Sequence, residues 1–425
     1  MARRRRVAVV GAGWAGLAAA LECAASGLDV SVFEMAPIAG GRARDVGTPE
    51  DGLDNGQHIC IGAYVETLRM VKMVGVAESE AFVRLPLQLV DAAGRGLRLG
   101  RGPARWAFAR AVLTRHGWSW RERAALLIRA GAWAQGGFTC DARSTVADLA
   151  AGLPRRLRTD LLDPLCIAAL NTPAEEASGT VFLRVLRDAL AGGAGASDLL
   201  LPRRQLGAVL PQPAVAHLRL IGASVSLAHR IERIETHGGQ WEADGQLFDR
   251  IVLASSPIEA ARLAAPVNAA WAERAAALRY EPIVTVYASS AGTRLDEPML
   301  LLQADAERPA QFVFDRGRLG GPEGTLAFVI SGAASWVERG IEATERAVLA
   351  QASSALAGQL RGPLLHVRTI QEKRATFRCI PGLQRPPMRV APGCVAAGDY
   401  VDGPYPSTLE GAVRSGVAAA HAAIA

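Results

Sequence analysis

The sequence predicts an α/β protein in which a Rossmann-type dinucleotide-binding domain carries an inserted α+β domain of mixed sheet and helices. Two observations predict this class: a glycine-rich turn after an apolar strand at residues 7–16, and a short apolar strand that ends in Gly-Asp at residues 394–399. The long stretch of chain between these two segments is expected to form another domain or insertions. The chain has 425 residues, 50% hydrophobic and 21% charged, which is long enough for two domains.

The N-terminal segment has the order strand, glycine turn, helix, strand and acid that a Rossmann unit requires. Residues 7–10 form a short apolar strand, residues 17–26 an alanine-rich helix, and residues 29–33 a second strand that stops at Glu34. The turn between the first strand and the helix has the sequence GAGWAG. The residues of this turn that we assign to the cofactor are Gly11, Ala12, Gly13, Ala15 and Gly16.

Each part of this motif has a physical reason. Gly11 permits the tight turn, Gly13 lets the backbone approach a pyrophosphate, and Gly16 lets helix and strand pack closely. The N-terminus of the helix offers free N–H groups and the positive end of its dipole to the phosphates. Glu34 can accept hydrogen bonds from both ribose hydroxyls and disfavours a 2′-phosphate, so the motif predicts FAD or NAD rather than NADP.

The segment after the acid distinguishes FAD from NAD. Residues 40–44, GGRAR, resemble the GGR extension of the FAD-dependent amine oxidase and phytoene desaturase superfamily. In that superfamily the glycines pass close to the pyrophosphate and the arginine supports it, which implies these roles for Gly41 and Arg42, with Arg44 as a helper. The alternative for the arginines is a solvated surface loop. The resemblance therefore implies non-covalently bound FAD.

A second part of the predicted FAD domain lies in the middle of the chain. Residues 223–227 begin a strand, residues 230–235 and 240–243 alternate like the strands of a hairpin, and residues 251–254 form a buried strand. In the superfamily this unit lies against the adenine. The match implies that Val225 contacts the adenine through its backbone.

The C-terminus supplies the last part. A short apolar strand ends in Gly398 and Asp399, and a loop then leads into a helix near Thr408 and Leu409. In the superfamily the aspartate binds the ribityl or pyrophosphate region, and the N-terminus of the helix points at the pyrimidine ring of the flavin. We therefore assign these four residues to the cofactor, although Asp399 could instead be an ordinary helix cap.

Several inner segments narrow the resemblance further. They are 54–58 (DNGQH), 62–64, 166–173, 182–186, 199–203 and 376–382. These segments resemble the hydroxysqualene dehydroxylases, also called squalene-associated FAD-dependent desaturases, and with the FAD motifs the likeness spans nearly the whole chain. The resemblance implies an FAD-dependent oxidoreductase of squalene and hopanoid biosynthesis that removes the hydroxyl of hydroxysqualene reductively to give squalene.

The implied reaction needs a proton for the leaving oxygen and a water-poor tunnel for a long isoprenoid. The hydroxyl is allylic, so its departure leaves a delocalised cation to which reduced flavin can deliver hydride. The candidate proton donors are Asp54, His58 and Tyr405. Packing or orienting the cofactor is the alternative role for each. Gly56 and Gln57 are assigned to the flavin ring.

These assignments predict a discontinuous organisation. We expect residues 1–63, 196–282 and 386–425 to form the FAD-binding domain. Residues 64–195, which look largely helical, and residues 283–385, which contain β-rich runs, are expected to form the substrate-binding domain.

A basic segment predicts contact with an anionic membrane surface. Residues 92–121 contain seven arginines and no acid, with Trp106, Trp118 and Trp120 interleaved, and we expect a helical, membrane-facing part near residues 92–135. A solvated arginine face over an internal apolar face is the alternative. The same pattern could bind nucleic acid, but nothing else in the chain resembles a nucleic-acid module, so we predict none.

The remaining composition favours the cytoplasm. None of the six cysteines falls in a CxxC pair and no histidines have metal-ligand spacing, so we expect neither disulfides nor a metal site. The chain has no uninterrupted run of 18 apolar residues, so we predict no transmembrane helix. We therefore expect peripheral attachment to the inner face of the cytoplasmic membrane. Residues 3–6 are four arginines before an apolar run, as in an export signal, but cleavage there would remove the glycine motif.

Two other functions remain open at this point. One is a carotenoid or phytoene-type desaturase, or an amine oxidase, of the same fold. The other is a prenyl-lipid-binding protein without redox activity, which would not require an intact FAD site.

Overall fold

The computed structural model describes residues 4–48 and 51–425, so Arg3 lies outside the described residues. Its centre is a six-stranded sheet in which all neighbours are parallel except the last pair. The first strand of the chain pairs with the second and with a strand from the middle, which in turn pairs with a C-terminal strand. In order, the strands are β10 (Ser224–Ser226), β2 (Asp29–Phe33), β1 (Arg6–Val10), β14 (Arg250–Leu253), β21 (Cys394–Ala396) and β20 (Arg389–Ala391).

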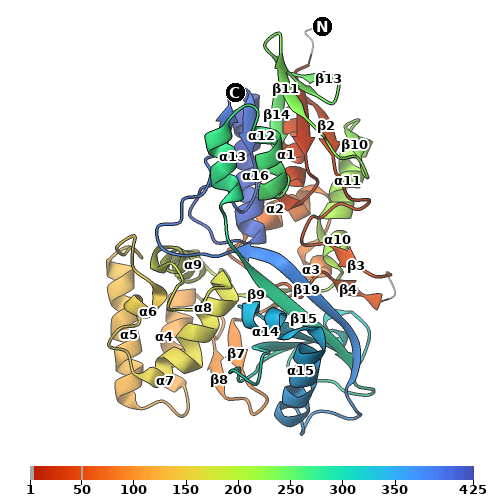
Figure 1. Cartoon of the computed structure of the whole chain (residues 1–425). Coiled ribbons are helices and arrows are strands. Elements are labelled where there is room, and N and C mark those ends of the chain that lie inside the picture. Colours follow the sequence, from red (N-terminus) through yellow and green to blue (C-terminus); the bar gives the residue numbers. More distant parts are fainter. Residues whose placement is uncertain (1–3, 49–50) are drawn as a thin grey trace.

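Helices from both ends of the chain pack together beside this sheet. Helix α1 (Trp14–Ala25) begins three residues earlier than predicted and packs along α16 (Leu409–Ile424), the C-terminal helix (Figure 1). Close packing depends on Gly416, because a Cβ there would overlap the carbonyl oxygen of Ala15. The surrounding elements are α2 (Val65–Met73), α3 (Glu78–Ala81), α10 (Leu206–Val209), α11 (Pro211–Leu220), α12 (Pro257–Ala264), α13 (Ala269–Ala276) and the small sheet of β11 (Ile234–His237), β12 (Gln240–Ala243) and β13 (Gln246–Phe248).

A second sheet lies below the first in Figure 1 and is antiparallel throughout. Two long strands, β15 (Tyr280–Ser289) and β19 (Leu365–Phe377), connect the two parts of the molecule. The runs predicted to be β-rich are strands here, as expected. The other elements are β16 (Met299–Leu301), β17 (Phe312–Asp315), η3 (Gly317–Leu319), β18 (Thr325–Ile330), α14 (Ala334–Arg339) and α15 (Ile341–Ala355).

A helical group lies beside the second sheet (Figure 1). The expectation of a largely helical segment holds from residue 104 onward, but residues 82–98 form strands, so the basic segment begins as a hairpin. The helices are α4 (Ala104–Thr114), α5 (Trp120–Gln135), α6 (Val146–Leu149), α7 (Arg155–Leu157), the π-helical turn η2 (Arg158–Leu162), α8 (Asp163–Leu170) and α9 (Gly179–Ala191). The remaining strands are β3 (Asp45–Val46), β4 (Leu53–Asp54), β5 (Cys60–Ile61), β6 (Phe82–Leu85), β7 (Gln88–Val90), β8 (Gly96–Arg98) and β9 (Leu199–Pro202).

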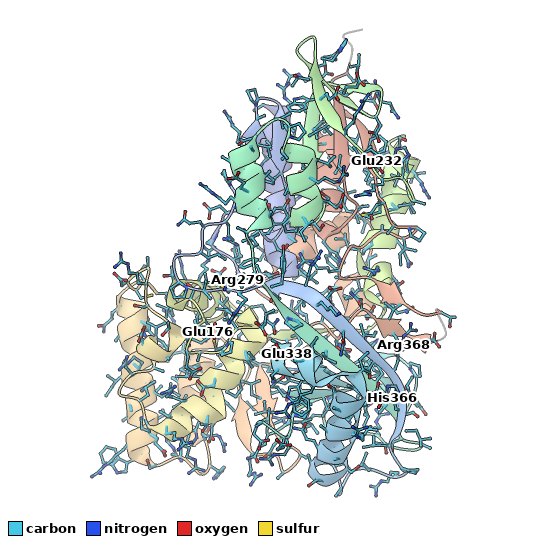
Figure 2. All side chains as sticks on the ribbon, in the orientation of Figure 1. Glu176, Glu232, Arg279, Glu338, His366 and Arg368 are labelled. Atoms are coloured by element: carbon cyan, nitrogen blue, oxygen red, sulfur yellow. The ribbon has the colours of Figure 1, made fainter. Side chains whose placement is uncertain are left out.

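Apolar side chains fill both parts. Most charged side chains are not buried, but a few, such as Glu34 and Arg316, are. Exposed residues such as Glu232, His366 and Arg368 lie on the periphery of the molecule (Figure 2). Among the described residues, no helix is long and apolar enough to span a bilayer. The exact division of the chain into two domains stays a prediction.

Candidate active site

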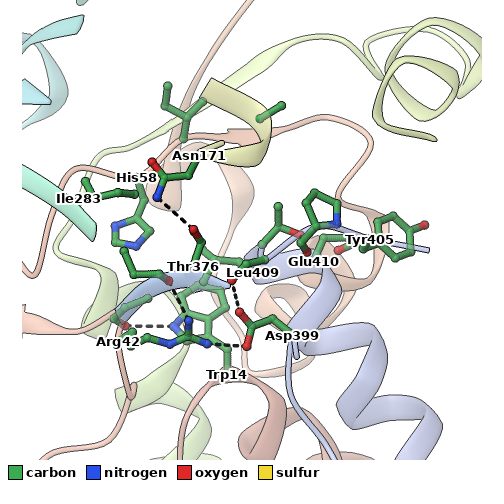
Figure 3. A pocket seen from close by; sticks show the side chains of 18 of the residues that line it. Trp14, Arg42, His58, Asn171, Ile283, Thr376, Asp399, Tyr405, Leu409 and Glu410 are labelled. Atoms are coloured by element: carbon green, nitrogen blue, oxygen red, sulfur yellow. Dashed lines mark hydrogen bonds and ion pairs between the residues drawn. The ribbon is translucent and has the colours of Figure 1, made fainter. Parts of the chain in front are cut away.

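One cavity of about 580 Å³ runs from the first sheet to the second sheet and the helical group. Its wall includes the glycine turn after β1, the loop after β2, the start of α16 and the inner faces of β15 and β19. Figure 3 shows this cavity from close by. Predicted site residues that line it are Gly11, Gly13, Ala15, Glu34, Gly41, Arg42, Gly56, Gln57, His58, Gly398, Asp399, Tyr405, Thr408 and Leu409. Those that do not line it are Ala12, Gly16, Asp54 and Val225.

The glycine turn leaves bare backbone facing the cavity. Gly11 has φ 112°, and a Cβ there would lie 2.6 Å from the carbonyl oxygen of Ala254. A Cβ on Gly16 would overlap the carbonyl oxygen of Gly11, so this residue acts through packing and not through contact with a ligand. At Gly13, in contrast, the nearest atom to a built Cβ is the Cα of Gly41 at 3.9 Å. The two glycine segments thus leave room for a group to approach the N-terminus of α1.

The acid after β2 is held in place by backbone donors. Glu34 is buried, and its two carboxylate oxygens accept hydrogen bonds from the N–H groups of Ala12 (2.7 Å) and Ala36 (2.8 Å). Its carbonyl oxygen accepts from His229 N–H at 2.8 Å. This arrangement places a fixed negative charge at the end of the cavity beside the first sheet.

The residue predicted at the adenine end lies outside the cavity wall. Val225 is on the edge strand β10, where it pairs with Val32, and it does not line the cavity. Residues 229–231 form the wall there, because the irregular chain just after β10 turns toward Glu34. Contact of Val225 with the adenine stays a prediction.

An ion pair at the cavity wall connects the two ends of the chain, with the Asp399 carboxylate buried and the Arg42 side chain 39% exposed. The guanidinium of Arg42 is paired with the carboxylate of Asp399, which also accepts a hydrogen bond from the Ser407 hydroxyl. The second arm of Arg42 donates to the carbonyl oxygen of Ala375 at 2.7 Å. Figure 3 shows this group below the other labelled polar residues. Pairing offsets the cost of burying Asp399 and fixes both side chains at the cavity wall.

Three of the buried hydroxyls without a partner among the described residues face the cavity. Two of them lie close to the first sheet: Ser255 Oγ, just after β14, and Tyr400 Oη, beside Asp399. Burial raises the pKa of Tyr400, so its hydroxyl stays protonated. Buried polar groups nearly always have partners in folded proteins, so these two fit a polar ligand in the cavity. With the glycine cradle and Glu34, they suit a dinucleotide cofactor with hydroxyl and phosphate groups.

His58 presents an acceptor to the cavity. Its Nδ1 lies 3.0 Å from the carbonyl oxygen of Gly56, and a carbonyl only accepts, so Nδ1 carries the hydrogen. Burial lowers the pKa of His58, with Arg42 adding to the effect, so the ring is neutral. Its Nε2 therefore has a free lone pair. A neutral histidine in this tautomer can accept a hydrogen bond at Nε2, and the role of His58 as a proton donor stays a prediction.

Gln57 is oriented by a buried cation. Arg316 is 2% exposed, has no carboxylate of a described residue within 4 Å, and donates to Gln57 Oε1 at 3.1 Å. Since a guanidinium cannot accept a hydrogen bond, the Gln57 oxygen must face Arg316. The amide nitrogen lies on the other side and donates to the carbonyl oxygen of His58 at 3.3 Å.

Asp54 does not line the cavity, and its role as a proton donor stays a prediction. One carboxylate oxygen accepts from Leu206 N–H at 2.7 Å, and its carbonyl oxygen accepts from the Tyr287 hydroxyl at 3.1 Å. Burial raises the pKa of Asp54 to about 7, although the Leu206 N–H and Arg316 lower it. The side chain joins the segment before Gly56 to α10 and serves the fold.

Two threonines that were not singled out in the sequence face the cavity. Thr376, near the end of β19, accepts a hydrogen bond from Asn171 Nδ2 at 3.0 Å (Figure 3). Asn171 Nδ2 also donates to the carbonyl oxygen of Glu281 at 3.2 Å, and Asn171 Oδ1 accepts from Gly332 N–H at 2.7 Å. These contacts occupy the remaining polar groups of the Asn171 side chain. The hydrogen of the Thr376 hydroxyl is therefore free to donate. Thr285 Oγ1 is also buried without a partner among the described residues.

Tyr405 lines the cavity, but its hydroxyl is engaged elsewhere. It accepts a hydrogen bond from Arg184 at 2.7 Å, and the ring lies against the guanidinium groups of Arg184 and Arg414. In Figure 3 the hydroxyl points away from His58 and Thr376. Thr408 caps α16 by accepting from Gly411 N–H at 3.0 Å, as its position in the predicted loop-to-helix boundary indicated.

Beyond this polar region the cavity is apolar. Its wall there consists of leucine, isoleucine, alanine, methionine and aromatic side chains from both the second sheet and the helical group. They include Leu87, Leu89, Phe108, Leu126, Trp133, Phe138, Leu161, Leu165, Leu186, Met299, Phe312 and Phe314. Such a chamber excludes water and suits a long apolar ligand.

Comparison with known proteins agrees with this arrangement. The family described as flavin containing amine oxidoreductase matches residues 14–424. The chain is 30% identical to a hydroxysqualene dehydroxylase of Rhodopseudomonas palustris, over 99% of each chain, and 29% identical to one of Sinorhizobium fredii, over 99% of this chain and 98% of the relative. An oxidoreductase from Methanosarcina mazei has the same fold, with a TM-score of 0.71 at 15% identity over 97% of this chain and 99% of that one.

Proposed function

This chain belongs to the flavin-containing amine oxidoreductase family, and from that premise we propose that it is an FAD-dependent enzyme that reduces hydroxysqualene to squalene with loss of water. The observation that carries the proposal is that one continuous cavity joins a dinucleotide-type site to an apolar chamber. The two full-length relatives named hydroxysqualene dehydroxylase support this substrate. A phytoene-type desaturase or an amine oxidase of the same fold is the alternative.

The residues around the glycine turn would hold FAD without a covalent bond. Gly13 and Gly41 leave room for the pyrophosphate, Glu34 suits the ribose hydroxyls, and Arg42 and Asp399 lie where the two ends of the chain meet. None of the described residues lining the cavity is a cysteine, which supports non-covalent binding. Bound and reduced, the flavin supplies a hydride to a carbon of the substrate.

The chain itself would orient the leaving hydroxyl. Replacing a C–O bond by a C–H bond requires that the departing oxygen take up a proton and leave as water. Thr285 and Thr376 can donate hydrogen bonds to that oxygen, and Nε2 of His58 can accept one. The apolar wall beyond them would keep water away from the allylic cation formed as the oxygen departs.

We further propose that the enzyme acts in the cytoplasm, attached peripherally to the inner face of an anionic membrane. A long isoprenoid substrate dissolves in the bilayer and not in water. All six cysteines are free thiols, which supports a reducing compartment. The arginine-rich helical group supports attraction to anionic lipid.

The test is an anaerobic reaction between the photoreduced protein and hydroxysqualene. We expect flavin reoxidation to match squalene formation, measured by mass spectrometry. A protein that binds FAD but makes no squalene would contradict the proposed reaction, and phytoene and simple amines would then be tested. A protein that purifies without flavin would contradict the cofactor assignment.

A further inference from the structure

Helix α5 has an unusually exposed apolar side. Leu126 is its one buried residue, whereas Trp120 is 73% exposed and Ile128 is 72% exposed. The neighbouring helix α4 exposes Trp106 by 67% and Leu113 by 55%. These two helices carry both of the exposed tryptophans among the described residues. Figure 1 shows α5 as the outermost element on its side of the molecule.

The opposite side of α5 forms part of the cavity wall. Leu126, Ala130 and Trp133 line the cavity and lie four and three residues apart, so they share one face of the helix. Ile128 lies two residues from both Leu126 and Ala130, a rotation of about 200°, so it points away from them. A single helix therefore separates the apolar chamber from the exterior.

At the C-terminal end of α5, the residues that line the cavity are also partly exposed. Ala130 and Trp133 line the cavity but are only half-buried, and so is Phe138, in the turn that follows the helix. Phe138 has φ 57°, which is uncommon for a residue other than glycine. The turn after α5 is thus held in a specific conformation that keeps an aromatic side chain at the edge of the cavity.

The charge around this apolar side is strongly positive. Residues 92–139 contain nine arginines and one acid, Glu122. The carboxylate of Glu122 accepts from the N–H and hydroxyl of Ser119 in the N-terminal cap of α5. In the described part of the chain, no carboxylate lies within 4 Å of Arg105, Arg110 or Arg121. Exposed tryptophan and unpaired arginine on the same two helices match an anionic bilayer surface.

We propose that the exposed face of α4 and α5, defined by Trp106, Leu113, Trp120 and Ile128, docks on an anionic phospholipid bilayer, and that the lipid substrate enters the cavity beside the C-terminal end of α5. The inference rests on the proposed function, since it assigns the route by which that substrate arrives. It separates two roles of one helix: the outer face binds the membrane and the inner face guides the isoprenoid chain.

The experiment measures co-sedimentation of the flavin-loaded protein with vesicles of equal parts phosphatidylcholine and phosphatidylglycerol. The double variant Trp120→Ala/Ile128→Ala is expected to bind these vesicles about tenfold more weakly or worse, because two large apolar side chains no longer enter the bilayer. The matched control is Leu220→Ala/Ile221→Ala, at the end of α11, where the side chains are 85% and 48% exposed. The control is expected to bind like the unmodified protein.

A second readout compares substrate delivered in vesicles with substrate delivered in detergent micelles. For Trp120→Ala/Ile128→Ala we expect a raised KM with vesicles and unchanged kinetics with detergent. The proposed docking would be overturned if the unmodified protein does not co-sediment with anionic vesicles. It would also be overturned if the double variant co-sediments as strongly as the unmodified protein. Vesicle binding that is lost equally in the Leu220/Ile221 control would overturn it as well. Normal vesicle behaviour with no squalene from either delivery would instead refute the proposed function and leave the docking surface supported.

Discussion

Thr376→Val tests whether a hydroxyl at the end of β19 recognises the oxygen of the substrate. The substitution keeps the side-chain volume and removes the donor that the structure leaves free. In a cavity that excludes water, a substrate oxygen without its donor loses about 1–3 kcal/mol. That corresponds to a decrease of kcat/KM by roughly 5–150-fold. The flavin content should not change, because Thr376 is not among the residues assigned to the cofactor.

The assay is anaerobic stopped-flow measurement of flavin reoxidation by hydroxysqualene. Thr376→Ser should restore most of the rate, since it returns the hydroxyl. The matched control is Thr172→Val: Thr172 is fully buried, donates to Leu170 O at 3.0 Å and accepts from Cys379 N–H at 3.1 Å, but it does not line the cavity. We expect this control to lower stability by about 1–3 kcal/mol and to leave kcat/KM unchanged.

The reasoning would be refuted if Thr376→Val reoxidised as fast as the unmodified protein. It would also be refuted if Thr172→Val lost the same activity, because the effect would then come from repacking and not from a contact with the substrate.

Three further predictions follow from the geometry. Because burial raises the pKa of Asp54 from 3.8 to about 7, the folded protein holds a proton there that the unfolded chain releases, so this group makes stability fall as the pH rises through that window. Asp54→Asn should therefore make the fall in Tm between about pH 5 and about pH 8 smaller than in the unmodified protein, with activity retained. An equally large fall in Tm, or a loss of turnover, would contradict this prediction. Gly16→Ala should yield protein without bound flavin, seen as loss of visible absorbance, because the new Cβ overlaps the Gly11 carbonyl oxygen; yellow protein at normal stoichiometry would be inconsistent with that clash. Tyr405→Phe should cost about 1.5–3 kcal/mol of stability through the lost bond from Arg184, with little change in kcat, and a large fall in kcat would restore Tyr405 as a proton donor.

The cofactor end of the site could be predicted because its determinants are local. A strand, a glycine turn and a helix follow one another within twenty residues, and the acid stands at the end of the next strand. The structure places Gly11, Glu34 and Arg42 along one cavity. Pairing of β14 with both β1 and β21 then brings the C-terminal Asp399 to the same place. The family resemblance predicted that the two ends of the chain meet at the cofactor site, and the strand pairing is what brings them together.

The substrate end could not be predicted in the same way, because it depends on contacts between distant segments. Asn171 and Thr376 are 205 residues apart in the chain, and Gln57 and Arg316 are 259 apart. Side-chain periodicity indicates which residues share a face of an element, but it does not indicate which other element covers that face. The proton-donor predictions at Asp54, His58 and Tyr405 therefore rested on residue type and on the resemblance that places their segments near the flavin.

By itself the sequence determined the fold class, the dinucleotide turn and the basic, tryptophan-bearing segment, since each is encoded by neighbours within a few turns of chain. Only the tertiary structure decided that His58 presents a lone pair, that Asp54 faces away from the cavity, and that α5 has one face on the cavity and one on the exterior. The physical reason is that tautomer, burial and exposure are set by the partners a side chain meets after the two sheets and the helical group have packed.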